Sequence, residues 1–156
     1  MSSSQIEERF QQLGIRLPTP APPAGAYVPW VLVDPLLFVA GQLPMWNGEL
    51  RYHGRIDGEI SVDDGYAAAR LCGLNLLAQV GEACSGRFER VRRVVRLGGF
   101  VLAAPGFTGH AKIMNGASNL MVDVFGAAGR HARFAVGAAS LPLGAAVEVE
   151  GIFELA

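Results

Sequence analysis

The feature that most limits how this chain can fold is one long helical segment with strand-like segments on both sides of it. Residues 61–86 read SVDDGYAAARLCGLNLLAQVGEACSG. Ser61 is placed to cap the helix, acidic residues fill its first turn, and Gly86 stands just past its end. Apolar and small residues recur at helical spacing and form one stripe: Tyr66, Ala69, Gly73, Leu76, Leu77 and Val80. We therefore expect an amphipathic helix that packs on a core along one side.

Strand-like and helical segments alternate along the rest of the chain. We expect a short helix over 6–15, a hairpin over 30–44 about Asp34-Pro35, a strand over 88–103, a second helix over 110–129, and strands over 132–138 and 145–155. The order of the main elements is thus β-β-α-β-α-β-β. Two helices interspersed in a small, mostly antiparallel sheet must cover one face of it, which predicts a two-layer α+β fold. The other face of the sheet is then bare unless it meets a partner.

Length and composition favour one domain that associates with copies of itself. The 156 residues suit a single compact domain, which we expect to follow a helix and a proline-rich arm in residues 1–24. Only 17% of the residues are charged and 51% are hydrophobic, whereas ordinary soluble domains carry about 25% charged residues. Because so little charge cannot cover the surface of a monomer, we expect an oligomer with apolar interfaces.

Charge and signal patterns argue against several classes of function. The net charge of −1 provides no overall field for nucleic acid or acidic membranes. In the arginine run RFERVRRVVR, strand alternation places Arg93 on one side and Arg90, Arg92 and Arg96 on the other. Because the chain is not basic overall, the run indicates a solvated or inter-subunit face. The first residues are polar, and no apolar run approaches the ~20 residues that span a bilayer. We expect a cytoplasmic protein without membrane contact, in which Cys72 and Cys84 are structural.

Common catalytic and metal-binding motifs are missing. The histidines His53, His110 and His131 have no partner at ligand spacing, so we expect no metal site. There is no G-x-S-x-G elbow and no phosphate-binding glycine loop. The pair Gly98-Gly99 lies inside a strand and is interpreted as a β-bulge.

Charged residues in the last two strands form the strongest candidate site. Alternation places Glu148, Glu150 and Glu154 on one face of the final strand. If the two strands are hairpin neighbours about the SLPLG turn, Arg133 faces the Glu148–Glu150 region. An exposed cross-strand ion pair is one interpretation, and it would contribute little to stability. The other is a ligand site in which the guanidinium of Arg133 grips a carboxylate with two hydrogen bonds. The pattern alone leaves both open.

Several motifs resemble one known family. The stretch HARFAVGAASLPLGAAVEVE is similar to the signature of the YjgF/RidA family, also called endoribonuclease L-PSP, in which Ala-Arg opens a strand and Leu-Pro precedes a strand of alternating Glu. GAYVP resembles the Gly-Pro-Tyr-Ser arm of that family, and LLFVAGQLPMWNGEL its Ser-Gly-Gln-Ile-Pro hairpin. NGASNLMVDVF falls where the family has an Asn-led helix. The resemblance covers residues 25–156.

This resemblance implies a fold, an assembly and an activity. The fold is a chorismate-mutase-like two-layer sandwich, and the assembly is a homotrimer with clefts between subunits. The activity is hydrolysis of enamines and imines such as 2-aminoacrylate to a 2-keto acid and ammonia, without metal or cofactor. The catalytic residues carried over are Arg133, which would clamp the substrate carboxylate, and Glu148, which would orient the attacking water.

Four further residues are carried over as substrate-binding. Tyr27 would close the pocket from the arm, Gly41 would form its floor, and the backbone of Ala135 would add a hydrogen bond. Asn119 matches the helix asparagine, with Asn115 as the alternate alignment. Ala40 stands where the family often has serine, and the arm reads Ala26-Tyr27-Val28-Pro29, so the natural substrate stays open. A non-catalytic ligand-binding protein and, less favoured, a ribonuclease or translation inhibitor are the alternatives.

Overall fold

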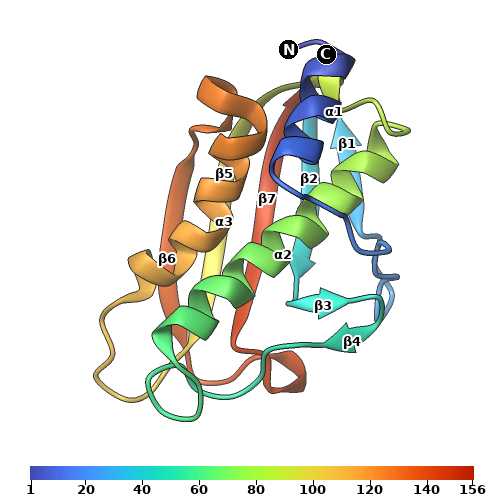
Figure 1. Cartoon of the computed structure of the whole chain (residues 1–156). Helices are drawn as coiled ribbons and strands as arrows, with labels where there is room; N and C mark the ends of the chain where they lie inside the picture. Colours follow the sequence, from blue (N-terminus) through green and yellow to red (C-terminus); the bar gives the residue numbers. More distant parts are fainter.

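The computed structural model describes all residues 1–156 and confirms the two-layer α+β fold (Figure 1). The helices are α1 (Ser3–Gln12), α2 (Val62–Ala83) and α3 (His110–Phe125), and the strands are β1 (Trp30–Val33), β2 (Leu36–Gln42), β3 (Met45–Trp46), β4 (Glu49–Leu50), β5 (Val91–Leu102), β6 (Ala132–Ala138) and β7 (Val147–Leu155). Short 3₁₀ turns cover Phe88–Arg90, Gly126–Gly129 and Pro142–Gly144. The main elements follow the predicted order, and the small β3–β4 hairpin is additional.

The helix ends follow from local hydrogen bonding. Ser61 caps α2, as expected, by accepting a hydrogen bond from the backbone N–H of Asp64 at 3.0 Å. Asn47 and Gly48 form the turn that joins β3 to β4, and both residues have positive φ, as a two-residue hairpin turn of this kind requires. The second helix is shorter than predicted because it gives way to a 3₁₀ turn at Gly126.

The five-stranded sheet has the order β1-β2-β7-β5-β6. Strand β6 pairs parallel to β5, and the other neighbours are antiparallel. The expected hairpin between the last two strands is therefore wrong, because β5 lies between them. The chain leaves β5 through α3 and returns as β6, and a helical crossover of this kind joins parallel strands. The Leu-Pro segment then carries the chain past the end of β5 to β7.

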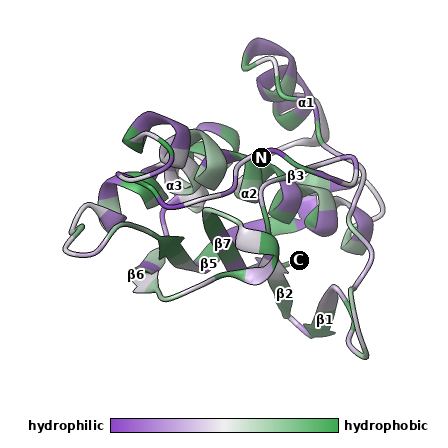
Figure 2. Cartoon of the chain, turned by 90° about the horizontal axis from the view of Figure 1, so that it is seen from below, coloured by the Kyte–Doolittle hydropathy of each residue, from purple (hydrophilic) through white to green (hydrophobic).

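Both long helices cover the same face of this sheet. Figure 2 shows α2 and α3 on one side of the strands, while the other side carries no helix. The core between the layers consists of buried apolar residues, among them Leu37, Leu76, Leu97, Ile113 and Phe153. None of the helices has the length and apolar character needed to cross a membrane.

The glycine pair in β5 is explained by packing. The predicted bulge at Gly98-Gly99 is wrong, since β5 and β7 keep one register from Arg96 to Val101. A Cβ at Gly98 would collide with the ring of Phe134, and one at Gly99 would collide with Met114 of α3. The glycines therefore let neighbours approach the strand from both faces.

The register of β5 shifts earlier, between Val91 and Arg93 and again between Val94 and Arg96. These irregularities place Arg93 opposite Glu154 and Arg96 opposite Ile152, so both arginines lie on the helix-free face. Strict alternation predicts opposite faces for Arg93 and Arg96, and that expectation is wrong.

Candidate functional site

Glu148 lies on the helix-free face of the sheet, directly beside Gly41. It is half-buried and stands opposite Phe100 of β5. A Cβ added at Gly41 would fall 3.0 Å from Cδ of Glu148, and closer still to one carboxylate oxygen. The register of β2 shifts between Val39 and Gln42, and this irregularity contains Gly41. The absence of a side chain at Gly41 thus makes room for the Glu148 carboxylate.

The neighbouring carboxylate of Glu150 is already neutralised. It pairs with Arg96 at 2.5 Å, and that guanidinium also lies 5.7 Å from the ring centroid of Phe134. Glu148 takes part in neither of the two salt bridges of the chain. Burial raises the pKa of Glu148 above its ordinary value. Of the two glutamates, Glu148 is therefore the one left available to hold a ligand or a water molecule.

An open hollow of about 400 Å³ surrounds these groups, lined by Gly41, Arg96, Phe100, Phe134, Glu148 and Glu150. The rings of Phe100 and Phe134 make part of the hollow apolar, and the carboxylate of Glu148 is its one unpaired charged group. Such a surface can hold a small polar molecule against Glu148, but it offers no unpaired cation to bind an anionic substrate.

Arg133 lies on the opposite face of the sheet. Its Cα partner in β5 is Leu97, which is buried under the helices, so the side chain runs toward α3. The guanidinium donates to Oδ1 of Asn115 at 2.8 Å, to the carbonyl of Ala111 at 3.3 Å and to Oγ of Ser118 at 3.2 Å. All three acceptors are neutral, so the positive charge of Arg133 has no carboxylate partner within the chain.

His131 fixes the orientation of the Ser118 hydroxyl, which in turn contacts Arg133. Nδ1 of His131 lies 2.6 Å from the carbonyl of Gly129, which can only accept, so Nδ1 carries the proton. Nε2 then accepts from the hydroxyl of Ser118 at 2.9 Å, which leaves Oγ of Ser118 free to accept from Arg133. Burial is the main cause that lowers the pKa of His131, and the nearby charge of Arg133 adds to it. A neutral imidazole therefore fixes the direction of this hydrogen-bond chain.

The predicted site residues divide into two groups. Gly41 and Glu148 meet on the helix-free face, while Arg133 and Ala135 lie on the other face of the edge strand β6. Asn119 is exposed and donates to the hydroxyl of Tyr66 on α2 at 3.1 Å, whereas the alternate Asn115 contacts Arg133. Sequence reasoning missed Ser118 and His131, because a serine and a histidine thirteen residues apart form no recognisable motif.

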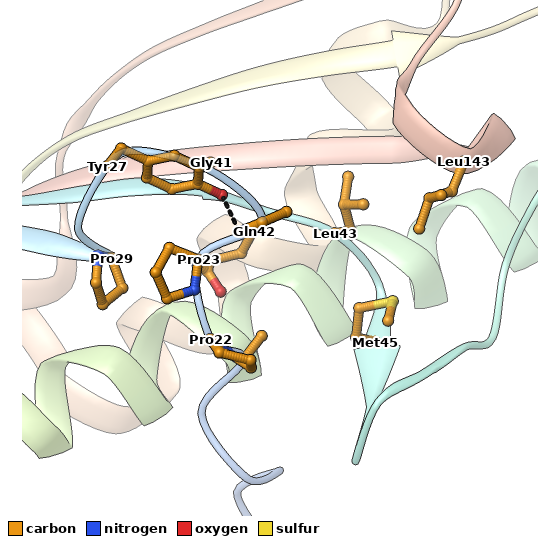
Figure 3. Close-up of a pocket in the computed structure, with 11 residues that line it drawn as sticks. Pro22, Pro23, Tyr27, Pro29, Gly41, Gln42, Leu43, Met45 and Leu143 are labelled. Atoms are coloured by element: carbon orange, nitrogen blue, oxygen red, sulfur yellow. Dashed lines mark hydrogen bonds between the residues drawn. The ribbon is translucent and has the colours of Figure 1, made fainter.

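Tyr27 stands on the arm beside a second, smaller pocket (Figure 3). Its hydroxyl accepts a hydrogen bond from the backbone N–H of Ala24 at 3.2 Å. The pocket has a volume of about 150 Å³ and shares Gly41 with the hollow at Glu148. Tyr27 and Glu148 therefore each line a cavity to which Gly41 also contributes.

A family model described as "YjgF/chorismate_mutase-like, putative endoribonuclease" matches residues 7–155. The chain belongs to the YjgF family. Membership confirms the resemblance carried by the Ala-Arg and Leu-Pro motifs and the chorismate-mutase-like fold.

Relatives of this YjgF chain are similar over nearly all of its length. Protein TCP17 of Trypanosoma cruzi is 44% identical, covering 99% of this chain and 97% of the relative. The crystal structure of Atu1372 from Agrobacterium tumefaciens, a protein of unknown function, is 44% identical with a TM-score of 0.92, covering 99% of this chain and 94% of that one. The YjgF gene product of E. coli is 25% identical with a TM-score of 0.62, covering 87% of this chain and 92% of that one.

The chain has no obvious metal-binding site. No group of three or more His, Cys, Asp or Glu side chains is arranged to hold an ion. Cys72 and Cys84 are both buried, and desolvation raises the pKa of each thiol, so neither is a ready thiolate ligand.

Proposed function

We propose that this protein is a small-molecule hydrolase that converts carboxylate-bearing enamines and imines to 2-keto acids and ammonia. The observation that carries the proposal is the uncompensated charge of Arg133, which three neutral acceptors hold in place at the edge of the sheet. A fixed guanidinium without a carboxylate partner is suited to bind the carboxylate of a ligand with paired hydrogen bonds.

The reaction needs little more than positioning. An imine carbon is already electrophilic, so a bound water has only to be held against it. Glu148 would take a proton from this water as its oxygen bonds to the carbon. Glu148 then returns this proton to the nitrogen, which gives a carbinolamine. In a second transfer Glu148 takes the hydroxyl proton and passes it to the amino nitrogen as the C–N bond breaks, which releases ammonia and leaves the carbonyl of the 2-keto acid. An enamine first moves a proton from nitrogen to its methylene carbon to become the imine.

We further propose that each site is completed between copies of the chain in a homotrimer. Arg133 and Glu148 lie on opposite faces of one sheet, so a single copy does not bring both to one ligand. A neighbouring copy placed against the edge strand would supply Glu148 and Gly41 to the Arg133 of the first. The exposed apolar side chains of the helix-free face support association: Val31, Val33, Phe38, Phe100 and Val136.

The decay of 2-aminoacrylate generated in solution tests the activity. We expect wild type to accelerate it, Glu148→Gln to lose roughly 10²–10⁴-fold in rate, and Arg133→Ala to lose about ten-fold or more in kcat/KM through the lost charge-assisted hydrogen bonds. Arg92→Ala and Glu154→Gln change the same residue types at other positions of the sheet and should keep the wild-type rate. A wild type no faster than buffer would overturn the enzymatic proposal and leave ligand binding.

Mixing the two impaired variants tests the shared site. When Arg133→Ala and Glu148→Gln chains are unfolded together and refolded, some interfaces join an intact Arg133 to an intact Glu148. Activity should then reappear in the mixture, whereas a site contained in one chain would give none. The endoribonuclease named in the family description is tested by incubating the same preparations with a single-stranded RNA. Cleavage that needs Arg133 and Glu148, without 2-aminoacrylate hydrolysis, would favour that function instead.

A further inference from the structure

The arm builds an apolar pocket beside the proposed reaction centre. Its wall comes from Pro22, Pro23 and Tyr27 on one side and from Leu43, Met45 and Leu143 on the other (Figure 3). None of its lining residues is charged, and Gln42 is the polar side chain among them. Pro22 and Pro23 belong to the proline-rich arm, so this pocket exists only because the arm is docked beside Leu43 and Met45.

Buried amides on α2 hold the pocket in shape. Nε2 of Gln79 donates to the carbonyl of Ala21 at 2.9 Å, and Nδ2 of Asn75 donates to the carbonyl of Met45 at 2.7 Å. Both side chains are only 1% exposed. Because a buried amide without partners is costly, these bonds keep both walls docked on α2. The pocket is therefore formed before a ligand arrives.

Leu143 marks the mouth of the pocket. It has φ of 59°, a left-handed conformation that leucine seldom adopts, and its side chain is 73% exposed. Strained residues of this kind persist where the surrounding structure holds them, and they gather at ligand sites. An apolar side chain held out at a pocket entrance can cover an apolar group that enters.

The pocket and the carboxylate of Glu148 are linked through Gly41. This residue lines both the arm pocket and the hollow that contains Glu148. A ligand with its reacting carbon at Glu148 can therefore extend a substituent past Gly41 into the pocket.

We infer that the preferred substrates carry an apolar side chain about the size of an isobutyl, thioether or benzyl group, as in the imino acids of leucine, methionine and phenylalanine. This inference rests on the proposed function and narrows its substrate class. The pocket volume of about 150 Å³ is the size at which an apolar cavity accepts a benzene ring. An unsubstituted 2-aminoacrylate leaves this space unused, and a charged side chain would lose its hydration there without gaining a partner.

The test compares imino acids generated in place from their amino acids by an amino-acid oxidase, with semicarbazide as a competing trap. Hydrolysis is read as the loss of trapped imine relative to a sample without the protein. We expect kcat/KM for the leucine and phenylalanine products to exceed that for the alanine product by on the order of 10²-fold, because each buried methylene adds to discrimination. The lysine product should be the poorest substrate.

Two variants tie this preference to the pocket. Met45→Trp fills it, and Leu143→Asn removes the apolar mouth while suiting the left-handed conformation. Each should lower the ratio of leucine-type to alanine-type kcat/KM by about ten-fold or more. Leu13→Asn, at an exposed leucine outside the pocket, should leave the ratio as in wild type.

The failures of the two proposals are distinguishable. Turnover of the alanine product without any preference for larger ones would overturn the pocket inference and leave the hydrolase in place. If no imine is hydrolysed, the hydrolase proposal is overturned. The pocket inference is then tested by the dissociation constants of pyruvate and 4-methyl-2-oxopentanoate. Tighter binding of the larger acid that is lost in Met45→Trp would support the inference, and equal binding would overturn it.

Discussion

At the scale of single residues, the two charged groups of the candidate site differ in how the fold treats them. Glu148 is half-buried beside Gly41, and its pKa is raised because burial disfavours the carboxylate. Arg133 keeps its charge and is given three neutral acceptors. One group is therefore prepared to exchange a proton, and the other to hold an anion.

The raised pKa of Glu148 predicts that the protein loses stability as this carboxyl ionises. A carboxyl with a folded-state pKa above its unfolded value adds stability that is present at low pH and is lost as pH rises through the folded pKa. Glu148→Gln removes this loss, so its Tm at pH 7 should equal or exceed that of wild type, with the advantage shrinking toward pH 4. A lower Tm at pH 7 would show that the carboxylate is stabilised by contacts.

The same group governs the pH dependence of the reaction. A general base must be ionised, so the rate should fall as pH drops through the pKa of Glu148, which burial raises above the ordinary glutamate value. Measuring kcat/KM between pH 4 and 8 checks this. An acid limb at the ordinary pKa of a glutamate would assign the base to another group.

The two asparagines of α3 offer a matched comparison. Asn115 accepts from Arg133, whereas Asn119 bonds to Tyr66. Asn115→Ala should weaken binding of a 2-keto acid by roughly ten-fold, as expected for one hydrogen bond to a charged group. Asn119→Ala should leave the dissociation constant unchanged. The reverse order, measured by calorimetry, would support the Asn119 alignment.

At the scale of secondary-structure elements, the approach of α3 to the sheet depends on Gly99. A Cβ at this position would enter the space of the Met114 side chain. Gly99→Ala should reduce the free energy of unfolding by about 1–3 kcal/mol, the usual cost of overpacking. Gly58→Ala, where a Cβ meets only ordinary contacts from 3.5 Å outward, is the control in urea unfolding. A Met114→Ala change in the Gly99→Ala background should recover part of the loss, and no recovery would contradict the packing explanation.

Element order and faces could be predicted from sequence, while strand pairing could not. The alternation of VEVEGIFE reports directly which side of the final strand is buried. The single buried stripe expected for residues 61–86 is wrong, because α2 is buried on every side from Leu71 to Val80. The pairing of β6 with β5 depends on the crossover through α3, and the short Leu-Pro connection favours a hairpin instead. No residue pattern in the sequence marks the register shifts of β5, so the faces of Arg93 and Arg96 could not be predicted correctly.

The candidate site shows the same limit. Arg133, Glu148, Tyr27 and Gly41 were found through motifs, because each lies in a stretch that resembles the family. The serine and histidine behind Arg133 become neighbours only when α3 ends and the chain turns into β6. Contacts of this kind arise from tertiary packing and carry no local signal.

At the scale of the whole molecule, the helix-free face exposes apolar side chains that no element of the chain covers. Five large apolar side chains on it are at least 37% exposed, with Val33 the most exposed at 61%. Burying such a surface against copies of the chain would stabilise an oligomer by roughly 25 cal/mol for each Å² of apolar area. We expect a particle of three times the 16.5 kDa chain mass.

A charge on this face should dissociate the assembly. Phe38→Asp places an unpaired carboxylate among apolar neighbours, and light scattering should then report a smaller particle with little 2-aminoacrylate hydrolysis. Leu13→Asp, at the C-cap leucine of α1 with similar exposure (40% against 41%), should leave the mass unchanged. A wild-type chain that runs as a monomer would remove the shared site altogether.

The docking of the arm by Gln79 has a consequence for proteolysis. If the arm detached, the buried amide of Gln79 would lose its hydrogen bond to the carbonyl of Ala21. We therefore expect the segment around Ala21 to detach from α2 in one cooperative step. Filling the pocket and seating the arm are then reciprocally coupled, and each strengthens the other by the same factor. A ligand that enters the pocket should therefore slow cleavage by trypsin after the exposed Arg16, which makes the N-terminus a built-in reporter of occupancy.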